Sequence, residues 1–174
     1  MMSDHLIGAA SGVVGGALGT VLMQQSMKLN DKLPAAIQPP KMKGDPAELM
    51  TAQYESLAGK LDPKMHQTVS RSLHFAYGAG WGALLGLAVP ALPRLSLGNV
   101  VLAGAAMGAA CWGAGFVGWL PAAKLVEPIH RQGATHAMTP LITHVLFGVV
   151  TALPLYAIGE YFFGWKRRRL FGVF

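Results

Sequence analysis

An apolar stretch with glycine at every fourth position, residues 73–87, constrains the fold of this chain more than any other segment. It contains no lysine, arginine, aspartate or glutamate, and three of its four glycines, Gly78, Gly82 and Gly86, are spaced four residues apart. Residues four apart share one face of a helix, so these glycines form a smooth groove along which a second helix can lie. In a bilayer this spacing is the usual signal for close helix packing. The stretch therefore predicts a membrane-spanning helix pressed against another helix.

The composition of the whole chain agrees with a membrane location. Of 174 residues, 52% are hydrophobic and only 13% are charged, whereas soluble domains carry about 25% charged residues. The 22 glycines lie mostly inside the apolar runs. In water each would cost a helix about 1 kcal/mol relative to alanine, but in lipid the backbone must satisfy its own hydrogen bonds and stays helical. An ordinary soluble domain is excluded.

The hydrophobic runs predict an all-α fold, a four-span transmembrane helical bundle that forms one domain over residues 1–174. A run of 22 residues rises about 33 Å as a helix, enough to cross the hydrocarbon core of about 30 Å. We expect the third span to be the central helix, because it has the smallest side chains, and to form an antiparallel hairpin with the second. The predicted spans are residues 6–27, 72–92, 99–120 and 141–163, and residues 28–71 form an extramembrane loop.

Rows of small residues at helical spacing predict which faces of the spans pack together. Three of the four spans carry such rows, more than one four-helix bundle needs internally, so we expect some to contact other membrane subunits or a second copy of the chain. The predicted helix-packing residues are Gly8, Gly12, Gly16, Gly78, Gly82, Gly86, Gly104, Gly108, Ala110 and Ala114. Ala106 and Gly118 extend the alanine row, and Gly15 and Gly19 form a further row.

The 28–71 loop contains the signals of an amphipathic helix. Asp45 and Pro46 form a helix start, with aspartate as the N-cap and proline at the first helical position. An apolar stripe at helical spacing follows, made of Met50, Tyr54, Leu57 and Leu61. Such a helix lies either on the membrane surface or against its own bundle. The later pair Asp62-Pro63 predicts that the second spanning helix begins before it enters the membrane.

The net charge of +6 indicates contact with lipid headgroups rather than with nucleic acid. No basic-aromatic nucleic-acid motif is present, whereas Lys166, Arg167, Arg168 and Arg169 directly follow the last span and predict contact with lipid phosphates. This cluster favours a cytoplasmic C-terminus by the positive-inside rule. A plain count points the other way, because nine lysines and arginines lie in the two loops opposite the termini and five on the terminal side.

Two histidines are the strongest candidates for binding a cofactor. His74 and His144 each stand near the start of a span, and spans two and four run in the same direction, so both lie at similar depth. Histidines on facing helices can ligate a b-type haem from both sides, and the nearby Gly78 and Gly148 would leave room for the macrocycle. The ordinary alternative is a pair of interfacial histidines bonded to backbone or loop.

Other titratable residues give weaker signals. Glu127 and His130 have the spacing used by di-iron sites, but the spans supply neither the second copy nor the further carboxylates that such sites need. Glu160 is the one carboxylate within a predicted span, which makes it a candidate proton-relay residue, although pairing with the basic tail explains it as well. No nucleophile, base and acid can be assembled, so we expect a non-enzymatic protein.

The order of these features resembles the small bacterial inner-membrane proteins of the YagU type, a domain-of-unknown-function family. The resemblance rests on the Gly-rich first span, the loop with Pro39-Pro40, the His-led second span, the last span opening with residues 144–148, and the basic tail. It implies a four-span protein of the bacterial inner membrane with its C-terminus inside and no assigned reaction.

Three functions are therefore open. The first is a non-enzymatic packing role, as an accessory subunit of a membrane complex or as a homo-oligomer. The second is a haem- or quinone-binding protein that uses His74 and His144. The third is a small channel or proton-coupled carrier, with Glu160 or another polar side chain facing a wet interior.

Overall fold

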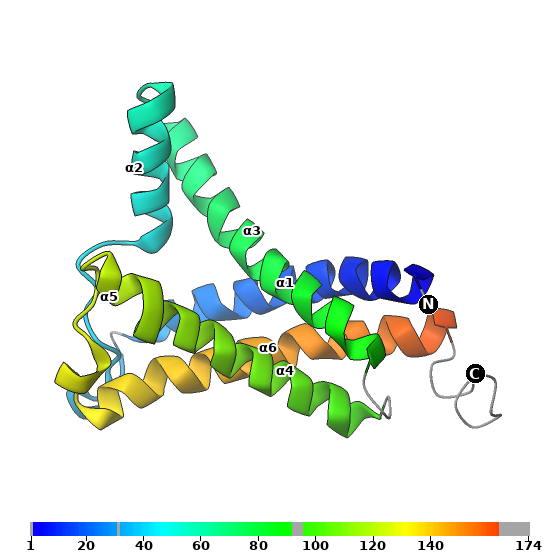
Figure 1. Ribbon diagram of the computed structural model, residues 1–174. Coiled ribbons are helices and arrows are strands. Elements are labelled where there is room, and N and C mark those ends of the chain that lie inside the picture. Colours follow the sequence, from blue (N-terminus) through cyan, green and yellow to red (C-terminus); the bar gives the residue numbers. More distant parts are fainter. Residues whose placement is uncertain (1, 31, 92–95, 164–174) are drawn as a thin grey trace.

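The computed structural model describes residues 2–30, 32–91 and 96–163, and within these ranges the regular structure is entirely helical (Figure 1). Four of the helices are long and apolar enough to cross a membrane. The protein is thus an all-α, four-span membrane protein, as its sequence predicts. The spanning helices are α1 (Met2–Asn30), α3 (Pro63–Ala88), α6 (Ala134–Phe163) and α4 (Leu97–Trp112), which continues through η3 and α5 to Ala122. The shorter elements are η1 (Ala35–Ile37), α2 (Pro46–Ala58), η2 (Val89–Ala91), η3 (Gly113–Trp119), α5 (Leu120–Ala122) and η4 (Ile129–Arg131).

The two terminal helices, α1 and α6, form the centre of the bundle. Helix α3 packs on α1, and α4 packs on α6, so the packing order is α3, α1, α6, α4 (Figure 1). Helices α3 and α4 follow each other in the sequence but touch little. The prediction of a central third span is wrong, and α3 and α4, although they run antiparallel, pack on different helices. The reason is that α1 carries glycine on two faces and accepts two neighbours, whereas the buried glycines of α4 meet α6 alone.

Helices α1 and α3 touch backbone to backbone through three glycine pairs. Gly8 lies against Gly86, Gly12 against Gly82, and Gly16 against Gly78. A Cβ atom on Gly82 would collide with the carbonyl oxygen of Gly12 and lie 2.9 Å from the Cα atom of Gly16. Two antiparallel rows of glycine thus bring the axes together over about two turns, and no side chain fits between them.

The other glycine rows also have partners inside the chain. Gly104 of α4 meets the backbone of Gly148, and Gly108 meets the carbonyl group of His144. On α1, Gly15 lies against Thr151 and Gly19 against Phe147. The alanine row differs, because its members are exposed on the outside of α4 and η3; they are Ala106, Ala110, Ala114 and Gly118.

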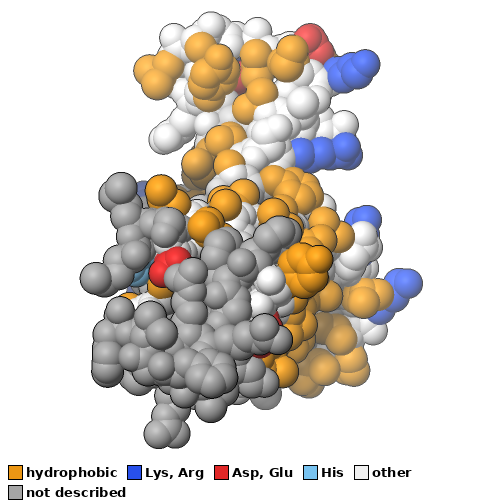
Figure 2. All heavy atoms as spheres, turned by 90° about the vertical axis from the view of Figure 1, so that its right-hand side faces the viewer, with side chains coloured by type: hydrophobic (Ala, Val, Ile, Leu, Met, Phe, Trp, Pro, Cys, Tyr) orange, Lys and Arg blue, Asp and Glu red, His pale blue; other side chains and the backbone are white. Residues whose placement is uncertain are grey.

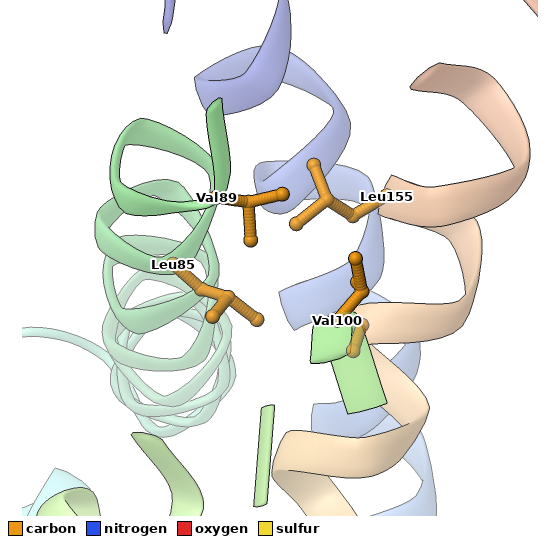
Figure 3. Packing of buried hydrophobic residues seen from close by; sticks show 5 residues of the cluster. Leu85, Val89, Val100 and Leu155 are labelled. Atoms are coloured by element: carbon orange, nitrogen blue, oxygen red, sulfur yellow. The ribbon is translucent and has the colours of Figure 1, made fainter. Parts of the chain in front are cut away.

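A cluster of buried aliphatic side chains closes one end of the bundle (Figure 3). Leu85 of α3 and Val89 of η2 point toward Leu155 of α6 and Val100 of α4. Val89, Val100 and Leu155 have no exposed surface. In this cluster, side chains of both outer helices, α3 and α4, pack together with side chains of the central helix α6.

Helix α2 and the first turns of α3 form an arm that projects from the bundle. Helix α2 starts where the sequence predicts, with Asp45 accepting a hydrogen bond from the Ala47 amide (2.7 Å). In Figure 1 α2 runs across the direction of α1 and α6, so it lies parallel to the plane of a membrane that those helices cross. Only its small residues Ala47 and Thr51 are buried.

Most of the predicted apolar stripe of α2 is exposed. Tyr54 and Leu57 are exposed, Leu57 by 90%, whereas Met50 is 44% exposed and also lines a cavity of the bundle. Leu61 lies beyond the end of α2 and is half-buried. Figure 2 shows hydrophobic side chains continuing from the bundle onto the arm, with lysines and arginines along one side. An apolar face that its own protein does not cover favours the membrane-surface alternative over docking on the bundle.

Candidate ligand-binding site

A cavity of about 380 Å³ lies between α1, α3, η3 and α6, within the size range of small-molecule sites. We call it the inner cavity. It is at the opposite end of the bundle from the aliphatic cluster, and both predicted histidines line it. The helical residues that line it are Thr20, Met23, Met27, Asn30, Pro46, Ala47, Met50, Leu73, His74, Tyr77, Gly78, Cys111, Gly115, Phe116, Trp119, Leu120, Thr139, Pro140, Thr143, His144 and Phe147. The lining is mainly apolar, with hydroxyl and imidazole groups at a few points.

The His144 ring is held in one orientation on α6. Its Nδ1 atom lies 2.7 Å from the carbonyl oxygen of Pro140, and because a carbonyl only accepts, Nδ1 carries the proton. The Phe116 ring packs edge-on against the imidazole, with ring centroids 5.7 Å apart. The proton on Nδ1 leaves Nε2 with its lone pair. His144 therefore offers a fixed hydrogen-bond acceptor or a ligand atom.

On α3, His74 lies one turn before Gly78, which pairs with Gly16 of α1. The place beside Gly78 is filled by Thr20, whose hydroxyl donates to the Gly16 carbonyl (2.8 Å). This contact keeps α3 against α1 at the level of the inner cavity, so the half-buried His74 lies at its wall. The structure thus brings His74 and His144 to one cavity from different helices.

The room predicted for a haem macrocycle beside the glycines is not there. Gly148 packs against the backbone of Gly104, and Thr20 occupies the space next to Gly78. That part of the prediction is wrong because both glycines serve helix contacts. Within the described ranges no three histidine, cysteine or carboxylate side chains are grouped so as to hold a metal ion.

A loop covers the inner cavity, a feature that the sequence analysis did not predict. It runs from Gln38 through the Pro39-Pro40 pair to Asp45, and its residues line the cavity. The His136 ring bonds the Gln38 carbonyl, Thr139 donates to the Ile37 carbonyl, and the Lys43 amide donates to Leu125 (2.8 Å). The stiff proline pair was a local signal of an extended segment, but its bonding partners are about 100 residues away.

A π-helical turn, η3, shapes the wall opposite α1. The Leu120 amide donates to the Gly115 carbonyl, five residues back, and Pro121 has no amide hydrogen to continue an α-helical ladder. Phe116 and Trp119, both in this turn, line the cavity. The sequence analysis missed this wall; three glycines followed by a proline were its one signal.

A second cavity of about 570 Å³, the outer cavity, adjoins the first beneath α2. It has Met27, Asp45, Ala47 and His74 in common with the inner cavity. Its remaining lining residues are Gln24, Lys28, Ser70, Arg71 and Phe75. His74 therefore lines both cavities, and the outer one brings Lys28 and Arg71 close to it.

The other predicted residues lie elsewhere. Glu160 lines neither cavity. Glu127 forms exposed ion pairs with Lys43 (3.6 Å) and Arg131 (3.9 Å). Ala110 and Ala114 are exposed on the bundle exterior. The basic residues 166–169 are outside the described residues.

Comparison with known proteins gives no further guide to the site. A scan against protein-family models, a search of curated proteins and a search of solved structures each found no match. The resemblance to YagU-type proteins stays a prediction, and the function is argued from the cavities.

Proposed function

We propose that this protein binds an apolar small molecule dissolved in the membrane, in the inner cavity between α1, α3, η3 and α6. The observation that carries the proposal is a covered, mainly apolar cavity into which two spanning helices bring histidines. Apolar walls with a few fixed polar groups are typical of small-molecule sites.

The polar groups that line the inner cavity restrict which functional groups the ligand can carry. Nε2 of His144 accepts a hydrogen bond, which suits a hydroxyl group on the ligand, and the Tyr77 hydroxyl at the same cavity can donate to a carbonyl or ether oxygen. A quinone or quinol, or a lipid with an oxygen-bearing head, meets these demands. A visible spectrum with a Soret band would instead establish haem.

Native mass spectrometry of the protein purified in a mild detergent tests the proposal. We expect wild type to retain a bound small molecule and Met23→Trp to lose it, because the larger indole fills the inner cavity. The control is Val21→Trp, a change on the same helix at a side chain that is 44% exposed outside the cavity, and it should retain the ligand.

Two results would overturn this proposal. One is wild-type protein without any bound molecule. The other is equal retention by all three proteins, which would mean that the molecules are lipids on the outer surface rather than in the cavity.

We further propose that the protein resides in the bacterial inner membrane with its C-terminus in the cytoplasm. The support is the lysine-arginine cluster at residues 166–169 and the positive-inside rule. Fusions test it: a fluorescent protein at the C-terminus should be bright, and alkaline phosphatase fused there should be inactive. The reverse pattern would place the C-terminus outside.

A second candidate function is self-association as a homo-oligomer, with a role as an accessory subunit as its variant. The glycine rows find partners within the chain, but the row from Ala106 to Gly118 is exposed and small, so a second copy could approach closely there. Ala110→Leu should then lower the mass measured by light scattering in detergent. Ala10→Leu, the same change at an exposed alanine of α1, should not. A monomeric wild type would remove this candidate.

A further inference from the structure

We infer that the ligand is a single-chain anionic amphiphile, with its acidic head in the outer cavity between Lys28 and Arg71 and its chain in the inner cavity. This inference rests on the proposed function and adds the chemical class of the ligand. The shared chemistry of the head is a phosphate or carboxylate group.

The two cavities adjoin and share part of their lining. Met27, Asp45, Ala47 and His74 belong to both. From these shared residues the inner cavity extends between mainly apolar walls, whereas the outer cavity, much of whose lining is also apolar, adds the cations Lys28 and Arg71. A molecule that is apolar at one end and charged at the other matches this division.

The charge of the outer cavity is unbalanced. Among the residues that the structure describes, no carboxylate lies within ion-pair distance of Lys28 or Arg71. Asp45 is the acid that lines the cavity, and its Oδ1 atom accepts the Ala47 amide at the start of α2, where the helix dipole offsets its charge. Two cations facing one committed carboxylate attract an anion.

The depth of the site also fits an amphiphile. Lys28 lies in the last turn of α1, and Arg71 lies just before the apolar stretch of α3 begins. Both therefore stand where a spanning helix meets the headgroup layer, in which the acidic group of a membrane lipid lies. A ligand whose acidic head stays at the level of the headgroup layer, near Lys28 and Arg71, places its chain in the inner cavity beside Tyr77 and Phe116.

Binding of two single-chain lipids, oleoyl lysophosphatidate and monooleoylglycerol, tests the inference, because they differ only in the phosphate. Affinity is measured by native mass spectrometry in an uncharged detergent. We expect wild type to bind lysophosphatidate about tenfold more tightly, with charge-assisted bonds as the cause. Lys28→Gln and Arg71→Gln should each reduce this preference about threefold or more.

Matched variants keep the result interpretable. Lys32→Gln removes an exposed lysine that lines neither cavity and should leave the preference intact. Lys28→Arg and Arg71→Lys keep the charge and should restore binding, which separates loss of charge from loss of fold.

Three results would overturn the inference, and they are distinguishable. Equal binding of both lipids in wild type and Gln variants, with loss of both in Met23→Trp, removes the anionic head but leaves the proposed function. Binding of both lipids that Met23→Trp does not change removes both proposals. Displacement of lysophosphatidate by millimolar inorganic phosphate would show a site for soluble phosphate instead of a lipid head.

Discussion

At the scale of single residues, what a glycine does depends on which atoms lie against it. Gly80 and Gly82 are two positions apart in the same apolar stretch. A Cβ atom on Gly80 would meet nothing within 4 Å, whereas on Gly82 it would strike the backbone of Gly12. Because backbone cannot move aside as a flexible side chain can, the two positions should respond differently to the same substitution.

We predict that Gly82→Leu destabilises the protein by about 2–4 kcal/mol or prevents it from folding, because α1 and α3 must separate to admit the side chain. Gly80→Leu, on the lipid-facing side, should stay within about 1 kcal/mol of wild type. Reversible unfolding in mixed detergent micelles measures both. Equal losses at the two positions would contradict the glycine contacts between α1 and α3.

The two histidines of the site could be predicted from the sequence, but the loop and the π-helical turn that complete it could not. His74 and His144 could be placed at one depth because both open spans that run in the same direction. The loop from Gln38 to Asp45 and the turn at Gly115 could not, because their roles depend on partners far away in the chain. Glycine spacing shows a smooth face but not whether a helix or a cofactor covers it, which is why the room beside Gly148 was misjudged.

At the scale of elements, a carboxylate fastens the turn between α2 and α3. Gly59 turns the chain with a positive φ of 97°. The Glu55 carboxylate then accepts hydrogen bonds from the His66 ring (3.0 Å) and the Leu61 amide (3.2 Å). These bonds, with the His66 bond as the larger cause, hold the pKa of Glu55 below its usual value of 4.5.

The lowered pKa predicts that acid loosens the arm. A group whose pKa is lower in the folded protein contributes stability above its unfolded pKa and loses it as the pH falls through the folded pKa. Protection of the Leu61 amide from hydrogen exchange, referenced to the intrinsic rate at each pH, should therefore be full near pH 6 and decline below about pH 4.5. Glu55→Gln should show the weaker protection at every pH. Unchanged protection in that variant would contradict the role of Glu55.

The outward stripe of α2 gives a second prediction at this scale. A spin label at Leu57 should be accessible to oxygen in the lipid, whereas a label at Ala52, which is also exposed but lies across the helix, should be accessible to a water-soluble relaxing agent. Water accessibility at both positions would show that α2 stands clear of the membrane.

At the scale of the whole molecule, the first and last helices, α1 and α6, form the centre of the bundle. The packing order of the four helices could not be predicted from the sequence. Each glycine row can pair with any other row of similar length, so spacing alone permits several arrangements of four spans. In the structure α1 has glycine on two faces, so it packs against two helices, whereas α4 has glycine contacts on one face and packs against α6. The number and helical type of the spans were predictable because hydropathy depends on the chain alone, whereas the helices extend beyond the predicted spans.

The arrangement predicts where the bundle is most sensitive. Leu155 is fully buried where α3, α4 and α6 meet, so Leu155→Ala should cost about 2–5 kcal/mol through a cavity that lipid cannot fill. Leu153→Ala, at a side chain that is 45% exposed, should cost less than about 1 kcal/mol. Chemical unfolding followed by circular dichroism compares them, and similar losses would refute the placement of this cluster.

The π-helical turn gives the third span a length that cannot be changed without consequence. The π-helical turn holds more residues per turn than an α-helix. The residues before Gly113 and those after Trp119 therefore do not follow one uniform α-helical count. Removing one residue between Phe116 and Trp119 would restore α-helical winding without rotating the helix beyond the turn, but the two rings would then lie two positions, or about 200°, apart around the axis. The chain would still cross the bilayer, yet Phe116 and Trp119 would no longer share a wall.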